Sequence, residues 1–321
     1  MLTVHLLTKD NEKTISNTLD SILPLECNII IGDLGSTDKT VSICKGYGIK
    51  PFVVNLEGNY SAARNSLLEH SKTEWNLYLH PWELLASGHI SLKNIESSAE
   101  AFRIRVLQNN VITKEIRLWR KLKFTNPVYE TLIGEAEILN DPLIFSNNAK
   151  EDYEEKLRII NQWKKADISS EPMYYEILTL LSMNRYDEFS ALAEKYLFSE
   201  KSGVPVVLMK YYLSLICFYI FKDIPRAYTH ILGCLLAAPL MAEFWCLLGD
   251  ILYNSKKFED AVVWYENAII LGSQRLNTDE FPIDIAKYKK YPEKMIASCK
   301  EIISKSAIYL VNNTVNNTTI L

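Results

Sequence analysis

The sequence predicts an α/β domain followed by an all-α domain, and two observations of hydrophobic pattern support this. In the first quarter of the chain, short apolar runs alternate with helical periodicity, an order typical of a mostly parallel sheet with right-handed crossovers. From about residue 151 the strand-like runs vanish and apolar residues recur at helical spacing. Because 321 residues are enough for two cores, we expect domains over residues 1–148 and 149–308 and a polar tail over residues 309–321.

The elements of the first domain follow in order along the chain. Apolar runs predict strands over residues 3–8, 28–31 (ending at Gly32-Asp33), 51–55 and 75–79. Helical spacing and N-cap residue types predict helices between them, over residues 13–23, 39–47 and 60–70. The pattern is strand-like again from residue 101 to about 145. Ligands of parallel sheets bind beyond the carboxyl ends of the strands, so we expect Thr8, Asp33 and His80 near one edge.

The helical half contains a repeated pattern. Residues 242–273 have the spacing of one tetratricopeptide (TPR) unit, with signature residues at Trp245, Leu248, Gly249, Ala261, Tyr265 and Ala268. Ala227 lies 34 residues before Ala261, and Pro239 lies 34 residues before Ser273. A weaker unit covers residues 174–196. Small residues let paired helices approach, so we expect a TPR-like helical domain, with a generic helical bundle as the alternative.

Composition argues against several classes of protein. A net charge of −4 is unsuited to a surface dedicated to nucleic acid. We recognise no apolar run of 18 residues and no signal peptide, and therefore expect no membrane span. None of the six cysteines forms a CxxC pair, which favours reduced, mostly buried thiols. These features together predict a cytoplasmic protein.

Five segments resemble family 2 glycosyltransferases, in the family's order. The most specific is IIIGDLGSTDKT over residues 29–40, which is similar to the family's hydrophobic strand followed by D-x-G-S-x-D-x-T. The others cover residues 6–21, 59–67 (NYSAARNSL), 75–84 (WNLYLHPWEL) and 117–130 (RLWRKLKFTNPVYE). The resemblance extends over about residues 1–145. It implies a GT-A fold, which is Rossmann-like, and transfer of a sugar from a nucleotide-diphosphate donor, with a UDP-sugar expected first and inversion of configuration.

The resemblance also implies a nucleotide site. Thr8 and Asp10 end the first strand, where the family holds the nucleotide. Asp33 would accept a hydrogen bond from the base, because uracil offers an N–H donor. Arg64 would hold Asp33 or a diphosphate oxygen with its planar donor fork. The alternatives are a turn or capping role for Asp33 and an ordinary surface position for Arg64.

The main departure from the family lies at His80, Trp82 and Glu83. The family has D-x-D-E here, and its carboxylates hold a divalent cation that neutralises the leaving diphosphate. The chain has His80 and Trp82 in place of both aspartates, so Mg²⁺ should bind poorly, whereas Mn²⁺ could accept His80 with Glu83. In a metal-independent mechanism, basic side chains such as Arg117 and Arg120 would balance the departing phosphates. A third alternative is a catalytically degenerate binding or scaffold protein.

Transfer with inversion needs a base that takes the acceptor's proton. Glu130 aligns with the glutamate of the family's V-H-E, with Tyr129 in place of the histidine. We therefore expect Glu130 to be catalytic, with a structural carboxylate as the alternative. Trp82 and Trp119 are candidates for stacking on the sugar or base, with core packing as their alternative.

The implied partners are a nucleotide-sugar donor and a macromolecular acceptor. The acceptor alternatives are a protein, a saccharide, and a modified base of DNA. The last is included because the many Asn, Ile and Lys residues fit an AT-rich, bacterial or phage genome. Stacked helix pairs present a long surface, so the TPR-like domain would hold the acceptor or form a homodimer.

Overall fold

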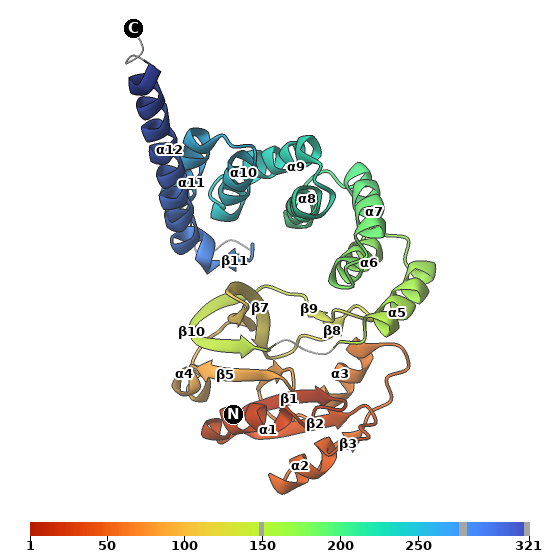
Figure 1. Ribbon diagram of the computed structural model, residues 1–321. Coiled ribbons are helices and arrows are strands. Elements are labelled where there is room, and N and C mark those ends of the chain that lie inside the picture. Colours follow the sequence, from red (N-terminus) through yellow and green to blue (C-terminus); the bar gives the residue numbers. More distant parts are fainter. Residues whose placement is uncertain (148–150, 276–280, 318–321) are drawn as a thin grey trace. The chain divides into compact units, whose positions relative to one another are not determined.

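The computed structural model describes residues 1–147, 151–275 and 281–317, with residues 307–317 described as backbone only (Figure 1). Two compact units divide the chain, Met1–Met183 and Asn184–Leu321. The change from strands to helices comes where the sequence pattern changes. The first two helices of the helical half, α5 (Tyr153–Ala166) and α6 (Glu171–Ser182), nevertheless belong to the first compact unit. The compact units therefore divide later than the change in secondary structure.

The first unit is built on one mostly parallel, mixed sheet with the order β3-β2-β1-β4-β7-β6-β10-β5. Its parallel part consists of β1 (Leu2–Thr8), β2 (Asn28–Asp33), β3 (Phe52–Val53) and β4 (Trp75–Leu79). The rest consists of β5 (Glu83–Ser87), β6 (Ala101–Gln108), β7 (Val111–Trp119) and β10 (Glu137–Ser146). Only β6 and β10 pair in parallel in this part. A separate hairpin joins β8 (Phe124–Thr125) to β9 (Thr131–Leu132).

Helices cover both faces of the parallel strands because side chains of β1 alternate between the faces. Leu6 packs in one core with Leu19 of α1 (Ile15–Ile22), whereas Leu7 packs in another with Leu67 of α3 (Tyr60–Leu68). The predicted helices and strands of this region are confirmed to within a few residues. The remaining elements are η1 (Leu23–Leu25), α2 (Thr40–Gly46) and α4 (His89–Lys93). Neither α4 nor β5 was predicted from the sequence.

The second unit consists mainly of helices, and successive helices lie side by side in Figure 1, α8 with α9 and α10 with α11. The helices are α7 (Tyr186–Ser199), α8 (Val204–Ile216), η2 (Cys217–Phe221), α9 (Ile224–Ala237), α10 (Ala242–Asn254), α11 (Phe258–Gly272) and α12 (Lys290–Asn317). Two short elements, β11 (Ile283–Asp284) and η3 (Ile285–Tyr288), precede α12. The helix α12 extends into residues 309–317, where we expected a polar tail; residues 318–321 lie outside the described residues.

The repeat predicted from the sequence appears as the same spacing of buried residues in three helices. Each of α7, α9 and α11 buries residues at the same three helical positions: Phe189, Ala193 and Tyr196; Ala227, Ile231 and Cys234; Ala261, Tyr265 and Ala268. In α10, a Cβ atom added to Gly249 would lie 2.6 Å from the ring of Tyr265, so this glycine lets the paired helices approach. The helical unit is therefore TPR-like.

One stretch of the described residues, Val204–Phe221, is long and apolar enough by length and composition to cross a membrane. Our expectation that no such run exists was wrong, because the average hydropathy stays high despite Lys210. Buried residues make up 39% of the stretch, and α8 packs against α9. A core helix passes the same test, so one such stretch is weak evidence for a membrane span.

Candidate functional site

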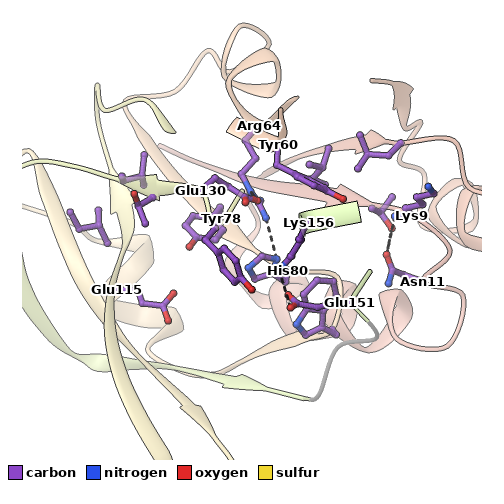
Figure 2. A pocket seen from close by; sticks show the side chains of 18 of the residues that line it. Lys9, Asn11, Tyr60, Arg64, Tyr78, His80, Glu115, Glu130, Glu151 and Lys156 are labelled. Carbon is purple, nitrogen blue, oxygen red and sulfur yellow. Dashed lines mark hydrogen bonds and ion pairs between the residues drawn. The ribbon is translucent and has the colours of Figure 1, made fainter. Parts of the chain in front are cut away.

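A cavity of about 470 Å³ lies in the first unit, beyond the carboxyl ends of β1 and β4 (Figure 2). Thr8 comes from the end of β1, His80 follows β4, and Arg64 comes from α3. The wall is completed by β7, by the β8–β9 hairpin and by the start of α5. The charged residues of the lining are the cations Lys9, Arg64, Arg103, Lys114 and Lys156 and the carboxylates Glu115, Glu130, Glu151 and Asp152.

Residues 80–83 form a turn whose side chains point to two different places. The N–H of Glu83 donates to the carbonyl of His80 at 3.0 Å, and proline at position 81 favours such a turn. The Glu83 carboxylate accepts two hydrogen bonds from Arg117, at 2.8 and 2.9 Å, and one from the His80 N–H at 2.8 Å. Both side chains of this ion pair are buried. Glu83 therefore fastens the turn to β7.

This pairing corrects two expectations. Glu83 was expected to bind a metal and Arg117 to contact phosphates, but neither belongs to the lining of the cavity. Arg117 also pairs with Glu115 at 2.8 Å, and these carboxylates raise the pKa of its guanidinium although burial opposes them. The two residues satisfy each other because an unpaired charge at this depth would be costly.

His80 and Trp82, by contrast, both line the cavity, and their rings stack with centroids 4.6 Å apart. Nη2 of Arg64 lies 3.1 Å from Nδ1 of His80. A guanidinium only donates, so Nδ1 is the acceptor and the neutral ring carries its proton on Nε2. Burial, followed by the charges of Arg64, Arg117 and Lys156, lowers the pKa of His80 well below its usual value. The imidazole is therefore neutral at pH 7.

Arg64 joins His80 to Glu130. Its Nε donates to Oε1 of Glu130 at 2.6 Å, and the two side chains are only 5% and 13% exposed. The guanidinium carbon lies 4.9 Å from the ring centroid of Tyr78, which adds a cation–π contact. We expected Arg64 to hold Asp33 or a phosphate, and among the described side chains it instead pairs with Glu130 (Figure 2).

The loop that presents Glu130 is braced by α6. Tyr129, just before it, has φ of 51°, a left-handed conformation that is unusual for a bulky residue. Its ring stacks on Tyr175 at 5.2 Å, and its hydroxyl lies 3.0 Å from the hydroxyl of Thr179. Sequence reasoning missed Tyr175 and Thr179, because no motif signals that α6 packs on this hairpin.

Asp10 and Asp33 do not line the cavity: Asp33 bonds within its own turn, and Asp10 connects its loop to the one at residues 37–38. Asp33 accepts from the N–H of Ser36 at 3.1 Å and from its hydroxyl. Asp10 accepts from the N–H of Thr37 at 2.7 Å, and this hydrogen bond is the main reason that the pKa of Asp10 is lowered. Asp33 therefore has the role in a turn that we gave as the alternative to base binding. Thr8 does line the cavity, and its hydroxyl donates to Asn11 at 2.8 Å.

Arg120 and Trp119 also lie away from the cavity lining. The guanidinium of Arg120 donates to the carbonyl of Ser97 at 2.6 Å and lies over the ring of Trp75 at 4.4 Å. Trp119 is fully buried, as the core alternative predicted. Lys156, which sequence reasoning did not single out, does line the cavity; its Nζ lies 2.9 Å from Glu151.

The carboxylates of the cavity do not suit a divalent cation as they stand, because each already has a partner. The pairs are Glu115 with Arg117 (2.8 Å), Glu130 with Arg64 (2.6 Å), Glu151 with Lys156 (2.9 Å) and Asp152 with the N–H of Glu155 (3.0 Å). No group of three His, Cys, Asp or Glu side chains that could hold a metal occurs in the described part of the chain. His80 and Glu83 therefore do not fit the metal site expected for them.

Comparison with solved structures finds helical proteins of low identity. MamA from residue 41 onward, from Desulfovibrio magneticus RS-1, is 19% identical, with a TM-score of 0.37 over 48% of this chain and 82% of that one. PcrH from Pseudomonas aeruginosa is 9% identical, with a TM-score of 0.35 over 40% of this chain and 90% of that one. The first TPR of Spaghetti (RPAP3), bound to the HSP90 peptide SRMEEVD, is 11% identical, with a TM-score of 0.33 over 41% and 90%.

No curated protein matches the chain. A family model does match residues 3–81, which contain β1 to β4, Arg64 and His80. Four of the five segments singled out in the sequence lie wholly or mostly inside this match, and the fifth, residues 117–130, lies beyond it. The matching family is glycosyl transferase family 2, so residues 3–81 carry the glycosyltransferase resemblance that the sequence motifs predicted.

Proposed function

We propose that this protein is a glycosyltransferase that moves a sugar from a nucleoside-diphosphate donor, a UDP-sugar in the first instance, to a macromolecular acceptor with inversion. The observation that carries the proposal is the convergence of Thr8, Arg64, His80 and Glu130 on one cavity beyond β1 and β4. Three of these residues lie inside the family match. The carboxyl edge of parallel strands is the usual place for a ligand in such sheets.

Glu130 takes the role of base in this proposal. One of its oxygens is held by Arg64, and the other has no hydrogen-bond partner among the described residues. That oxygen would accept the proton of the acceptor group while the acceptor attacks the anomeric carbon of the sugar. The bond from that carbon to the β-phosphate oxygen breaks, and its electron pair leaves with the nucleoside diphosphate. Trp82 offers an aromatic face in the same cavity for the base or sugar.

The proposal is tested by calorimetric titration with UDP, GDP and CMP. We expect micromolar binding of UDP that weakens roughly tenfold or more in Arg64→Lys, because lysine cannot reproduce the planar fork. Arg185→Lys is the matched control, since Arg185 is half-exposed and pairs with Glu188 on α7. Absence of binding by all three nucleotides would refute the proposal.

A binding or scaffold protein is the second candidate. It is favoured by His80 and Trp82 in place of the family's aspartates, and by the partners that already occupy the cavity carboxylates. The two candidates differ in turnover. A scaffold would bind nucleotide sugars without releasing nucleoside diphosphate, whereas a transferase releases it when the acceptor is present.

The acceptor, the compartment and the oligomer belong to the same proposal. Protein, saccharide and modified DNA are the acceptor classes to present to the enzyme. All six thiols are free, which supports a reducing, cytoplasmic location. A homodimer through the helical unit is proposed because stacked helix pairs present a long surface. Sedimentation of the protein would show the oligomeric state.

A further inference from the structure

We propose that this site binds the donor's diphosphate without a divalent cation, through the side chains of Arg64, His80 and Lys156. The inference rests on the proposed function and specifies how its donor is held. It follows from three observations: the ion pair that holds Glu83, the hydrogen-bond donors that face the cavity, and the exposure of the Lys156–Glu151 pair.

The first observation concerns Glu83. A hard divalent cation needs several anionic or carbonyl oxygens, and Glu83 supplies the single carboxylate of the turn at residues 80–83. Both of its oxygens accept from Arg117, and the two side chains are 2% and 3% exposed. Recruiting Glu83 to a metal would leave the Arg117 charge with less compensation in the interior, which is unfavourable.

The second observation concerns the donors. Arg64 uses one N–H for Glu130 and another for His80, and its other N–H groups have no partner among the described residues. A guanidinium held at two points is a preorganised fork for phosphate oxygens. His80 is oriented by the same contact, because accepting at Nδ1 leaves its N–H at Nε2. Stacking on Trp82 fixes the plane of the ring.

The third observation concerns Lys156, which lines the same cavity as His80 (Figure 2). It pairs with Glu151, but these side chains are 14% and 29% exposed, unlike the buried pair beneath the turn. The more exposed pair is better screened by solvent, so separating it costs less than separating the buried pair. Lys156 can therefore exchange Glu151 for a phosphate oxygen, and its charge then offsets the charge that develops on the leaving diphosphate.

The first test is calorimetric titration of the whole chain with UDP and GDP, in EDTA and in Mn²⁺. We expect the tighter of the two nucleotides to bind with a Kd that agrees within about twofold between the two conditions. Binding that occurs only with Mn²⁺, or that Mn²⁺ strengthens tenfold or more, would overturn the metal-free inference and leave the proposed function standing. Absence of binding in both conditions would overturn the proposed function itself.

The second test isolates Lys156. In EDTA, Lys156→Met should weaken UDP binding roughly ten- to hundredfold, the usual effect of losing a charge-assisted contact, while uridine binding stays unchanged. Lys164→Met is the matched control, because Lys164 lies on the same helix, pairs with Glu176 at 2.6 Å and does not line the cavity. Equal effects of the two variants on UDP, or an equal loss of UDP and uridine in Lys156→Met, would contradict the inference.

Discussion

At the scale of single residues, the ion pair of Glu83 with Arg117 shows how one contact decides between a structural and a catalytic role. Both side chains are buried and joined by two hydrogen bonds. We expect Glu83→Gln to lower the free energy of unfolding by about 3 kcal/mol, at the low end for a buried pair because Glu115 still partners Arg117. Urea unfolding measures this. If Glu83 were a metal ligand instead, Glu83→Gln would weaken nucleotide binding and leave the free energy of unfolding almost unchanged.

Glu188→Gln is the matched control for that measurement. Glu188 also pairs with an arginine, Arg185 at 2.6 Å, but both side chains are well exposed. Surface pairs contribute little, so the control should leave the urea midpoint almost unchanged. If both variants lose the same stability, the account of Glu83 is wrong.

His5 makes the stability of the first unit depend on pH. Burial lowers its pKa to about 4, although a hydrogen bond with Asn76 at 2.9 Å opposes this. Below pH 6.5 the unfolded chain therefore binds a proton that the folded chain does not, so stability falls as the pH falls from 6.5 to 4. The slope is about 1.4 kcal/mol per pH unit for one histidine. His80 acts in the same direction.

The measurement is the urea midpoint at several pH values, in the native chain and in His5→Gln. Glutamine does not titrate, so the slope of the variant should be shallower between pH 6.5 and 4. Identical slopes in the two proteins would show that His5 does not contribute. Other groups that titrate in this range affect both proteins alike, and the difference between slopes removes them.

At the scale of elements, the brace between α6 and the β8–β9 hairpin links a helix to the proposed base. The hydroxyl of Thr179 lies 3.0 Å from that of Tyr129, whose strained backbone precedes Glu130. We expect Thr179→Val to lower kcat for sugar transfer about fivefold with little change in the donor KM, because one hydrogen bond is worth about 1 kcal/mol. Thr229→Val, which removes a hydroxyl that bonds a carbonyl on α9, is the control. A rise in KM without a fall in kcat would contradict a positioning role.

The TPR-like pairing of α10 and α11 depends on Gly249. A Cβ atom there would lie 2.6 Å from the Tyr265 ring, so Gly249→Ala should cost about 1–3 kcal/mol through overpacking. Gly233→Ala provides the contrast, since the nearest atom to its added Cβ is 3.4 Å away, on Lys210. Alanine favours helix there, so that variant should be neutral or slightly stabilising. Thermal unfolding of both variants checks the pairing, and equal midpoints would contradict it.

Most of these helices and strands were predictable from the sequence, because the spacing of apolar residues differs between helices and strands. Alternation and helical spacing predict β1 to β4 and α1 to α3, and the 34-residue step predicts the shared register of α9 and α11. The brace was not predictable, because Tyr129, Tyr175 and Thr179 are far apart in sequence. Their contact depends on how α6 packs, which no local pattern encodes.

The candidate site was predictable only in part, for the same reason. The motifs place Thr8, Arg64, His80 and Glu130 around one cavity, and the structure brings them together. Motif alignment cannot reveal that Arg117 pairs with Glu83, because this ion pair joins two segments that are far apart in the sequence. The same applies to Asp10, Asp33 and Arg120, which bond within their own surroundings, and to Lys156, which comes from outside the motifs.

At the scale of the whole molecule, the chain combines an α/β unit that contains the cavity with a unit made mainly of helices. The first unit holds the cavity with its cations Arg64 and Lys156, which in our proposal bind the anionic donor, and the helical unit has the stacked helix pairs proposed for the acceptor. Each unit has its own core. The proposed division of labour is therefore donor binding and chemistry in residues 1–183, with acceptor binding or self-association in the helices.

The most direct measurement of the proposed activity is release of UDP or GDP from a panel of nucleotide sugars, offered with acceptor fractions, by the native chain and by Glu130→Gln. We expect release by the native chain and a loss of at least a hundredfold in the variant, because an amide is not a base. Nucleotide affinity should be preserved, because the amide oxygen of glutamine can still accept from Arg64. No release from any donor, or equal release by both proteins, would contradict a glycosyltransferase that uses Glu130.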